Sequence, residues 1–588
     1  MYMRERIGVT TAHTSKATMA FKIKNAPSLL FLFTFFYNIA CSPFNPEPMA
    51  ATTGGHWVQL QRSIGISAMH MQVMRDNKVV IFDRTDFGPS NISLPFSRCR
   101  FNPRDMALKL DCTAHSVLYD LSLNTLRPLT ILTDAWCSSG ALSLDGTLFQ
   151  TGGFNDGHNK LRTFSPCPQH PETCDWLELP WNLTSSRWYA SNQILPDGRI
   201  IVLGGRNSFT YEFVDPNSIF TAPENPNSFF FLRFLKVTRD SNPGEENNLY
   251  PFLHLLPDGN LFVFANRRSI LLDYKRNIVL REFPVIPGIE KRNYPSTGSS
   301  VLLPIHLSGL DDPTRLPHAE IMICGGAFPG AFNLANINKI FIEASRTCGR
   351  IRVTDPEPKW IMETMPFPRV MPDMVLLPTG DVVIINGAAN GTAGWENAAN
   401  PVRYPVLYKP GLHEPLSRFE ILAPAKTARM YHSSAVLVPD GRILVGGSNP
   451  HRGYDFQAYP YPTELSLDAY YPDYLGPEFE TLRPSIIAVE ATNNTASYGG
   501  NFSVTFSLRR SLAGISVALV APSFTTHSFS MNQRVVVLHV AALQEVAASE
   551  FKVTARGPPS PTVAPPGYYM VFVVHAGVPS VAVWVQVK

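Results

Sequence analysis

The sequence predicts an all-β protein, a seven-bladed β-propeller followed by an immunoglobulin-like β-sandwich. Three observations support this prediction. The chain of 588 residues contains 51 prolines and only 16% charged residues, which disfavours long exposed helices. A unit of a turn followed by a strand recurs along most of the chain, and residues 482–588 instead carry short alternating strands. The formal net charge of +3 also argues against a nucleic-acid-binding surface.

An apolar run near the N-terminus, residues 29–36, follows Lys22 and Lys24 and precedes small residues around Ala40. This order is typical of a secretory signal peptide, and the run is too short to span a bilayer. We therefore expect residues 1–41 to form a signal region, with Met19 as an alternative start; a buried strand is the other interpretation. No later uninterrupted apolar run is long enough for a membrane span, so we expect none.

Five glycosylation sequons follow the predicted signal, and they fit a secreted glycoprotein of the cell wall or apoplast. Their acceptor residues are Asn91, Asn182, Asn390, Asn493 and Asn501.

The repeated unit has a period of about 60 residues, which is typical of kelch-like blades of four strands. Asp-Gly between apolar runs is a strong hairpin signal. An accidental similarity within a β-sandwich would not keep this spacing through six intervals. We assign residues 53–480 to the propeller, with 464–475 supplying the strand that completes the last blade, and 482–588 to the sandwich. The units are residues 75–83, 144–153, 196–205, 257–266, 318–326, 378–387 and 439–447.

The position eight residues before the turn aspartate carries reactive side chains in three blades: Cys137, Tyr189 and His432. Tyr250 and Met371 occupy it in two others. The same offset in each blade should lie at the same place around the axis, so these side chains could converge there. The alternative is that each is an ordinary core residue.

Five segments resemble the signature segments of the copper-radical oxidases, the galactose oxidase and glyoxal oxidase family, and are most similar to its plant aldehyde oxidase branch. The resemblance covers residues 53–588. The segments are WCSSGALSLDG (136–146), RWYASNQILPDG (187–198), RMYHSSAVLVPDG (429–441), TTHSFSMNQR (525–534) and APPGYYMVFVV (564–574).

The resemblance implies a site with one copper ion per chain and no organic cofactor. Cys137 would form a thioether to the ring of Tyr189, which would carry a radical. Tyr189, Tyr431, His432 and His527 would ligate copper, since imidazole and oxygen donors suit Cu(II). Tyr431 would take the proton of a substrate hydroxyl. The expected reaction is oxidation of an aldehyde hydrate to a carboxylic acid, with O2 reduced to H2O2.

The eight cysteines are consistent with this assignment. Cys41 lies beside the predicted signal cleavage site, and Cys137 belongs to the thioether, which leaves six for three disulfides. The simplest of their 15 connectivities joins neighbours. A disulfide to Cys137 is the alternative, and it would leave another cysteine unpaired. The expected pairs are Cys99 with Cys112, Cys167 with Cys174, and Cys324 with Cys348.

The sequence departs from galactose oxidase in the loop of residues 206–225, which has no tryptophan to stack over the modified tyrosine. Phe209 or Tyr211 could substitute for it, and the departure favours small aldehydes over sugars. We expect a monomer whose partners are an aldehyde and O2. The alternative function is a catalytically inactive secreted propeller that binds glycans or a protein.

Overall fold

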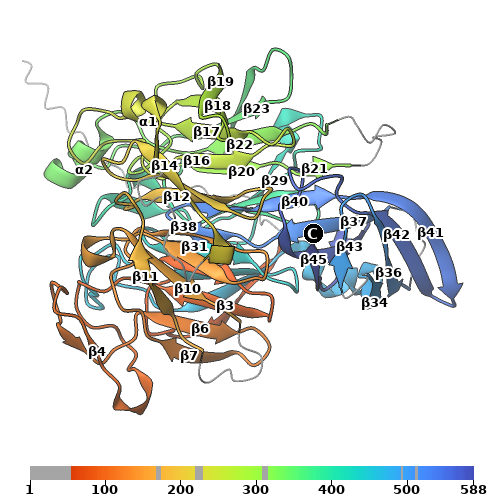
Figure 1. Ribbon diagram of the computed structural model, residues 1–588, viewed down its shortest axis with the longest axis horizontal. Helices are drawn as coiled ribbons and strands as arrows, with labels where there is room; N and C mark the ends of the chain where they lie inside the picture. Colours follow the sequence, from red (N-terminus) through yellow and green to blue (C-terminus); the bar gives the residue numbers. More distant parts are fainter. Residues whose placement is uncertain (1–53, 167–173, 219–228, 308–315, 492–493, 510–513) are drawn as a thin grey trace, which may run out of the picture. The chain divides into compact units, whose positions relative to one another are not determined.

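The computed structural model describes residues 54–166, 174–218, 229–307, 316–491, 494–509 and 514–588. The predicted signal region and Asn493 lie outside these ranges. Strands dominate the described part, and the helices α1 (Arg233–Thr238) and α2 (Ala331–Asn338) lie on connections between strands (Figure 1). The all-β prediction is confirmed. Among the described residues, no helix has the length and apolarity to cross a membrane.

The repeat forms seven successive antiparallel sheets, the blades of the predicted propeller, with four blade strands each; two strands from the C-terminal segment extend the first sheet to six. Except in the fifth blade, the turn of the repeat joins the first strand of a blade to the second. The first four blades are β2 (His70–Val73), β3 (Lys78–Phe82), β6 (Ser116–Asp120) and β7 (Thr125–Leu129); β8 (Ser139–Leu142), β9 (Leu148–Thr151), β10 (Lys160–Phe164) and β11 (Leu177–Asn182); β12 (Ala190–Ile194), β13 (Ile200–Gly204), β14 (Thr210–Val214) and β15 (Phe229–Phe231); and β16 (Phe252–Leu255), β17 (Leu261–Ala265), β18 (Arg268–Asp273) and β19 (Ile278–Glu282).

The first strands of most neighbouring blades contact each other and form an inner ring. Six of these strands are fully buried, and β8 is buried except for the half-buried Leu142. The other three blades are β20 (Ser299–Leu302), β22 (Glu320–Cys324), β23 (Thr347–Arg352) and β24 (Trp360–Thr364); β25 (Asp373–Leu376), β26 (Val382–Ile385), β29 (Val406–Tyr408) and β30 (Phe419–Ile421); and β31 (Ser433–Leu437), β32 (Ile443–Gly447) and β33 (Leu467–Tyr471) with β1 (His56–Gln61).

The last blade is closed by the first strand of the described chain. The strand predicted within residues 464–475 is β33, but it is third in its sheet, and β1 pairs with its outer edge. Trp57 of β1 packs against Tyr470 and donates from its indole Nε1 to the carbonyl of Ala423 at 2.9 Å. The two ends of the propeller sequence therefore meet in one sheet.

The C-terminal segment forms the predicted sandwich of two sheets. One sheet contains β34 (Ser485–Glu490), β36 (Asn501–Ser507), β42 (Glu550–Arg556) and β41 (His539–Ala547). The other contains β40 (Arg534–Val537), β37 (Ile515–Ala521), β43 (Gly567–His575), β45 (Val583–Val587), β35 (Thr495–Ala496) and β44 (Val578–Pro579), and the propeller adds β21 (Ile305–His306) beside β40.

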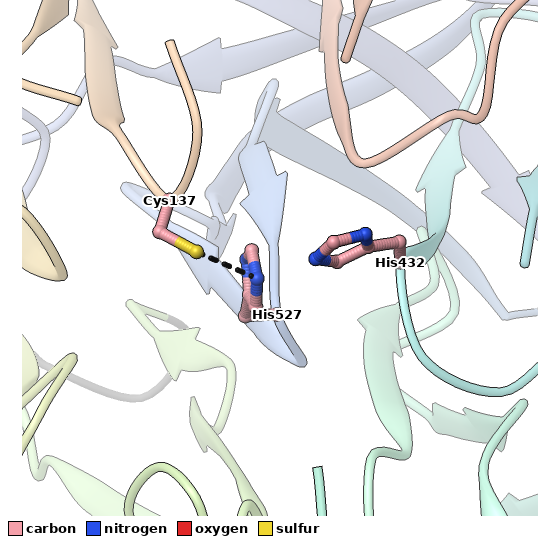
Figure 2. Close-up of side chains that lie close together, drawn as sticks. All are labelled: Cys137, His432 and His527. Atoms are coloured by element: carbon pink, nitrogen blue, oxygen red, sulfur yellow. Dashed lines mark hydrogen bonds between the residues drawn. The ribbon is translucent and has the colours of Figure 1, made fainter. Parts of the chain in front are cut away.

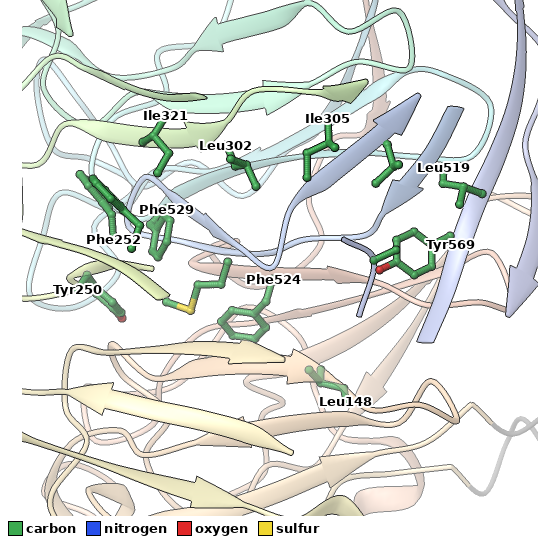
Figure 3. Close-up of a cluster of buried hydrophobic side chains, with 14 of the residues drawn as sticks. Leu148, Tyr250, Phe252, Leu302, Ile305, Ile321, Leu519, Phe524, Phe529 and Tyr569 are labelled. Carbon is green, nitrogen blue, oxygen red and sulfur yellow. The ribbon is translucent and has the colours of Figure 1, made fainter. Parts of the chain in front are cut away.

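A hairpin of β38 (Phe524–Thr526) and β39 (Phe529–Met531) leaves the sandwich and enters the inner ring. Strand β38 pairs with β2 and contacts β8, while β39 contacts β12, β20 and β25. Figure 3 shows Phe524 and Phe529 of this hairpin in one apolar cluster with Leu148 and Phe252 of the blades. The hairpin is therefore part of the propeller core, held by backbone pairing and by burial of its aromatic rings.

Short elements decorate the connections between the blades. Two further hairpins are β4 (Arg100–Phe101) with β5 (Leu110–Asp111), and β27 (Ala388–Gly391) with β28 (Ala398–Pro401). The single turns of 3₁₀ helix are Pro95–Ser97, Asn155–Gly157, Pro216–Ser218, Pro415–Ser417, Asp473–Leu475 and Pro477–Leu482.

Buried arginines join the loop before a first strand to the end of the second strand of the same blade. Arg187 donates to the carbonyl of Gly204, and Arg429 to that of Gly447, both at 2.8 Å. Arg292 and Arg369 bind Gly325 and Asn386 in the same way. A buried carbonyl without such a donor would cost about 1–3 kcal/mol, so these contacts hold the loops in place.

A substitution at the closing strand tests its contribution to stability. We expect Trp57→Ala to lower the free energy of unfolding by about 2 kcal/mol, because it removes a half-buried ring and a hydrogen bond. Urea denaturation of the purified protein measures this. Val58→Ala is the matched control: Val58 neighbours Trp57 on β1 but is 36% exposed, so its loss should change stability by less than about 1 kcal/mol. Equal losses of stability in the two variants would contradict the role of Trp57 in holding β1 in the last blade.

Candidate metal centre

The residues that share the predicted register lie one or two positions before an inner strand, and all have left-handed backbone. The φ angles are 54° for Cys137, 67° for Tyr189, 49° for Tyr250, 58° for Met371 and 61° for His432. This conformation costs bulky residues energy and is concentrated at functional sites. The loop therefore turns sharply at each of these positions and directs its side chain away from the strand that follows.

His527 comes from the C-terminal segment and lies at the tip of the hairpin of β38 and β39. Thr526 pairs with Phe529, so His527 and Ser528 form a two-residue turn, and both have positive φ. Such a turn usually carries Asn and Gly. Its occupation by histidine therefore indicates a functional constraint. The Nδ1 atom of His527 is 2.7 Å from the Thr526 hydroxyl, which leaves Nε2 directed elsewhere.

Cys137, His432 and His527 converge at the end of this hairpin, from three separate segments of the chain (Figure 2). The Nε2 atom of His527 lies 3.2 Å from the Cys137 sulfur. The two imidazole rings are 5.1 Å apart and nearly perpendicular. One ligand atom from each of the three residues falls within 4.8 Å of the others. The arrangement can hold one metal ion.

The ring of Tyr250 stacks on that of His527, with centroids 5.2 Å apart. Three further phenol groups lie close to these residues, and sequence reasoning missed one of them. The Tyr189 hydroxyl donates to the hydroxyl of Tyr294 at 3.2 Å, and the hydroxyls of Tyr294 and Tyr431 are 2.9 Å apart. Each tyrosine follows a buried arginine by two residues, in RWY, RNY and RMY. Tyr294 does not share the eight-residue register, but this Arg-x-Tyr pattern could have found it.

Burial keeps the side chains of the site neutral. It lowers the pKa of His432 and of His527 well below the usual value, and neighbouring positive charge acts in the same direction. It raises the pKa of Tyr189 and Tyr431 well above the usual value. The pKa of the Cys137 thiol is also raised by burial, against the effect of its contact with Tyr189. Both imidazoles can therefore offer a lone pair.

The residues present fit a copper ion. Both ring nitrogens of the buried His432 lack a hydrogen-bonding partner among the described residues, which is costly unless a ligand is bound. Two imidazoles and the phenol oxygens of Tyr189 and Tyr431 form the nitrogen and oxygen set that suits Cu(II). The thiol of Cys137 offers a different set, two histidines and a thiolate, which also binds copper. The two assignments of Cys137, as cross-link or as ligand, make different predictions.

A tryptophan packs against the ring of Tyr189 in a tilted arrangement, although not at the positions suggested by the sequence. The ring of Trp188 lies 4.8 Å from that of Tyr189, and the Arg206 guanidinium covers both rings at 4.9 and 5.7 Å. Phe209 and Tyr211 instead belong to a core cluster in the third blade, where Tyr211 stacks on Phe230. The expectation for Phe209 or Tyr211 was wrong because the residue adjacent to Tyr189 supplies the ring.

Aromatic rings extend from Trp188 across this face of the site. Trp136, which precedes Cys137, stacks on Trp395 of the loop between β27 and β28 with ring centroids 5.2 Å apart. Trp136 also packs against Trp188, and Phe154 contacts both. The side chains that pack next to Trp188, on this side of Tyr189, are therefore largely apolar and aromatic.

Two predicted disulfides are confirmed, Cys99–Cys112 and Cys324–Cys348. Cys174 is also disulfide-bonded, but Cys167 lies outside the described residues, so that pairing stays a prediction. Cys137 is the free cysteine of the described chain, which is contrary to its pairing in a disulfide.

The predicted glycosylation sites differ in accessibility. Asn91, Asn182 and Asn501 are exposed. Asn390 is half-buried, and its amide donates to the carbonyl of Phe341. A glycan would therefore be accommodated more readily at the first three.

Comparisons with known proteins agree with this geometry. A family model for the glyoxal oxidase N-terminus matches residues 69–474, and one for the galactose oxidase-like early set domain matches 483–587. The chain is 45% identical to the aldehyde oxidase GLOX of Vitis pseudoreticulata over 90% of this chain and 97% of that protein. It is 44% identical to the aldehyde oxidase GLOX1 of Arabidopsis thaliana over 91% and 84% of the two chains.

A solved fungal alcohol oxidase of the AA5 family, in complex with copper, superposes with a TM-score of 0.67 at 18% identity and covers 92% of this chain and 100% of its own. This likeness supports the propeller and sandwich architecture. From the family models and the plant relatives together, the chain belongs to the glyoxal oxidase family.

Proposed function

We propose that the chain is a secreted copper-radical oxidase that converts aldehydes, as their hydrates, into carboxylic acids and reduces O2 to H2O2. The observation that carries this proposal is the convergence of five side chains from four segments, Cys137, Tyr189, Tyr431, His432 and His527. Among the described residues, the buried imidazole of His432 has no hydrogen-bonding partner. An inactive binding propeller has no need for this set. Membership of a family whose plant relatives are named aldehyde oxidases supports the same substrate class.

The residues of the site would divide the reaction between them. Copper held by His432, His527, Tyr189 and Tyr431 would supply a one-electron acceptor, because Cu(II) takes up one of the two electrons released. Tyr431 Oη accepts the proton of one substrate hydroxyl. Tyr189 then takes a hydrogen atom from the substrate carbon as its radical is quenched. The atoms balance, since one aldehyde hydrate and one O2 give one carboxylic acid and one H2O2.

The thioether between Cys137 and Tyr189 would stabilise that radical by spreading it onto sulfur. Its formation removes one hydrogen atom from the thiol and one from the ring, and O2 is the oxidant that accepts them. Burial raises the pKa of the Cys137 thiol, so the thiol is neutral in the absence of a metal ion, and the cross-linking chemistry would depend on copper and oxygen.

The direct test is to load purified protein with Cu(II) and to measure H2O2 release with an aldehyde and alcohol panel. We expect release with glyoxal or methylglyoxal and much less with galactose. Absence of peroxide with every substrate, in protein that has bound copper, would favour the inactive propeller.

The Cys137→Ala variant distinguishes the cross-link from a copper-ligating thiolate. We expect it to bind copper as the unsubstituted protein does but to lose oxidase activity by at least about a hundredfold, or roughly 3 kcal/mol of barrier. Mass spectrometry should show a cross-linked peptide, two hydrogen atoms lighter than its parts, in the unsubstituted protein and not in Cys137→Ala. Met371→Ala is the control at the same register and should keep the cross-link. Loss of copper binding in Cys137→Ala would show that the thiol is a ligand.

The contribution of the sandwich is tested at His527. We expect His527→Ala to weaken Cu(II) binding by at least about a hundredfold, because it removes one imidazole ligand. His70→Gln is the matched control, since the His70 ring lies only 6.3 Å from that of His527 but its nitrogens already face the Phe82 carbonyl and the Ser138 hydroxyl. Equilibrium copper titration measures both. Unchanged Cu(II) affinity in His527→Ala would show that the C-terminal segment contributes no copper ligand.

A further inference from the structure

The hydroxyl of Tyr294 lies between the two tyrosines assigned to copper. It is 3.2 Å from the Tyr189 hydroxyl and 2.9 Å from that of Tyr431, and its ring is 4.5 Å from the ring of Tyr189. Tyr294 is also 7% exposed, compared with 2% for Tyr189 and 3% for Tyr431. A molecule that approaches both phenol oxygens would therefore meet Tyr294 as well.

Several contacts hold Tyr294 in this place. The preceding Asn293 donates to the carbonyl of Tyr250 at 2.9 Å and accepts from the backbone of Asn266 at 2.8 Å. Arg292 anchors the start of the same loop on the Gly325 carbonyl. The hydroxyl is thus presented by a rigid loop, which is the usual requirement for a recognition group.

The hydrogen-bonding capacity of the three phenols indicates what Tyr294 could bind. A phenol has one donor and two acceptor lone pairs. In the structure Tyr189 donates to Tyr294. A tyrosine oxygen that ligates copper has no proton to donate, so Tyr294 would then lose this donor. Its buried oxygen would be left with an unfilled acceptor position, which a hydroxyl group of the substrate could fill.

We propose that Tyr294 is a specificity-determining residue that accepts a hydrogen bond from the second hydroxyl of an aldehyde hydrate. A hydrate carries two hydroxyls on one carbon; one can meet Tyr431 and the other Tyr294, which are adjacent in the site. A primary alcohol has a single hydroxyl and leaves Tyr294 unpaired. A site built to bond a hydroxyl discriminates against the analogue that lacks it. This inference rests on the proposed function and assigns a residue to the recognition of its geminal diol substrate.

The test uses two unreactive probes that differ only in the second hydroxyl. Trifluoroacetone hydrate is a geminal diol, and in trifluoro-tert-butanol a methyl group replaces one hydroxyl. Neither has a hydrogen on the carbinol carbon, so neither can be oxidised. Their affinities for the copper-loaded protein can be measured by calorimetry, alongside the copper content. We expect the unsubstituted protein to prefer the diol by roughly tenfold, the value of one hydrogen bond.

Tyr294→Phe keeps the ring and removes the hydroxyl, so we expect the preference for the diol to fall to about one while copper content stays the same. Tyr250→Phe is the matched control, because the Tyr250 hydroxyl donates to the Ser138 carbonyl at 3.0 Å; this variant should keep the preference. A preference that survives in copper-loaded Tyr294→Phe would overturn the proposal, as would equal affinities for the two probes in the unsubstituted protein. Failure of the proposed function is distinguishable, because the unsubstituted protein would then release no H2O2 from any aldehyde.

Discussion

The contact between a buried arginine and a backbone carbonyl is the constraint on which the site depends. In four blades the arginine before the first strand holds the end of the second strand, and the functional residue follows two positions later in three of them. Burial lowers the pKa of Arg292 to about 10 and of Arg369 to about 9, so both stay charged at neutral pH. A charged donor makes a stronger hydrogen bond to a carbonyl than a neutral one. The loops that carry Tyr189, Tyr294 and Tyr431 are therefore anchored independently of any metal.

The hairpin of β38 and β39 places a ligand at the centre of the ring of blades. A blade can place a side chain in the site only from the loop that precedes its first strand. The hairpin instead pairs with β2, contacts several inner strands, and brings His527 to the loops of Cys137 and His432. Sandwich and propeller are consequently coupled through the core as well as through the site, as the shared cluster of Phe524, Phe529 and the blade residues shows.

The repeat made much of the fold predictable, because each Asp-Gly turn marks the same point in a blade. Counting from it identified Cys137, Tyr189 and His432, which the structure brings close together. His527 lies outside the repeat, so only the family resemblance indicated it. The closing role of β1 was missed because pairing between distant chain ends leaves no local pattern. Trp188 was missed because an aromatic partner for Tyr189 was expected in the following loop. The structure instead packs the preceding residue, Trp188, against the ring of Tyr189.

The neutrality of its buried side chains allows the site to be closely packed. Burial disfavours charge on the imidazoles and on the phenols, so the closely packed groups do not repel one another. The hydrogen bonds among Tyr189, Tyr294 and Tyr431 satisfy the phenols, while the ring nitrogens of His432 have no hydrogen-bonding partner in the described part of the chain. A cation that enters this site would reverse the balance, because it favours the ionised phenols that burial opposes. These groups are thus costly to bury on their own, and a bound metal ion would make their burial favourable.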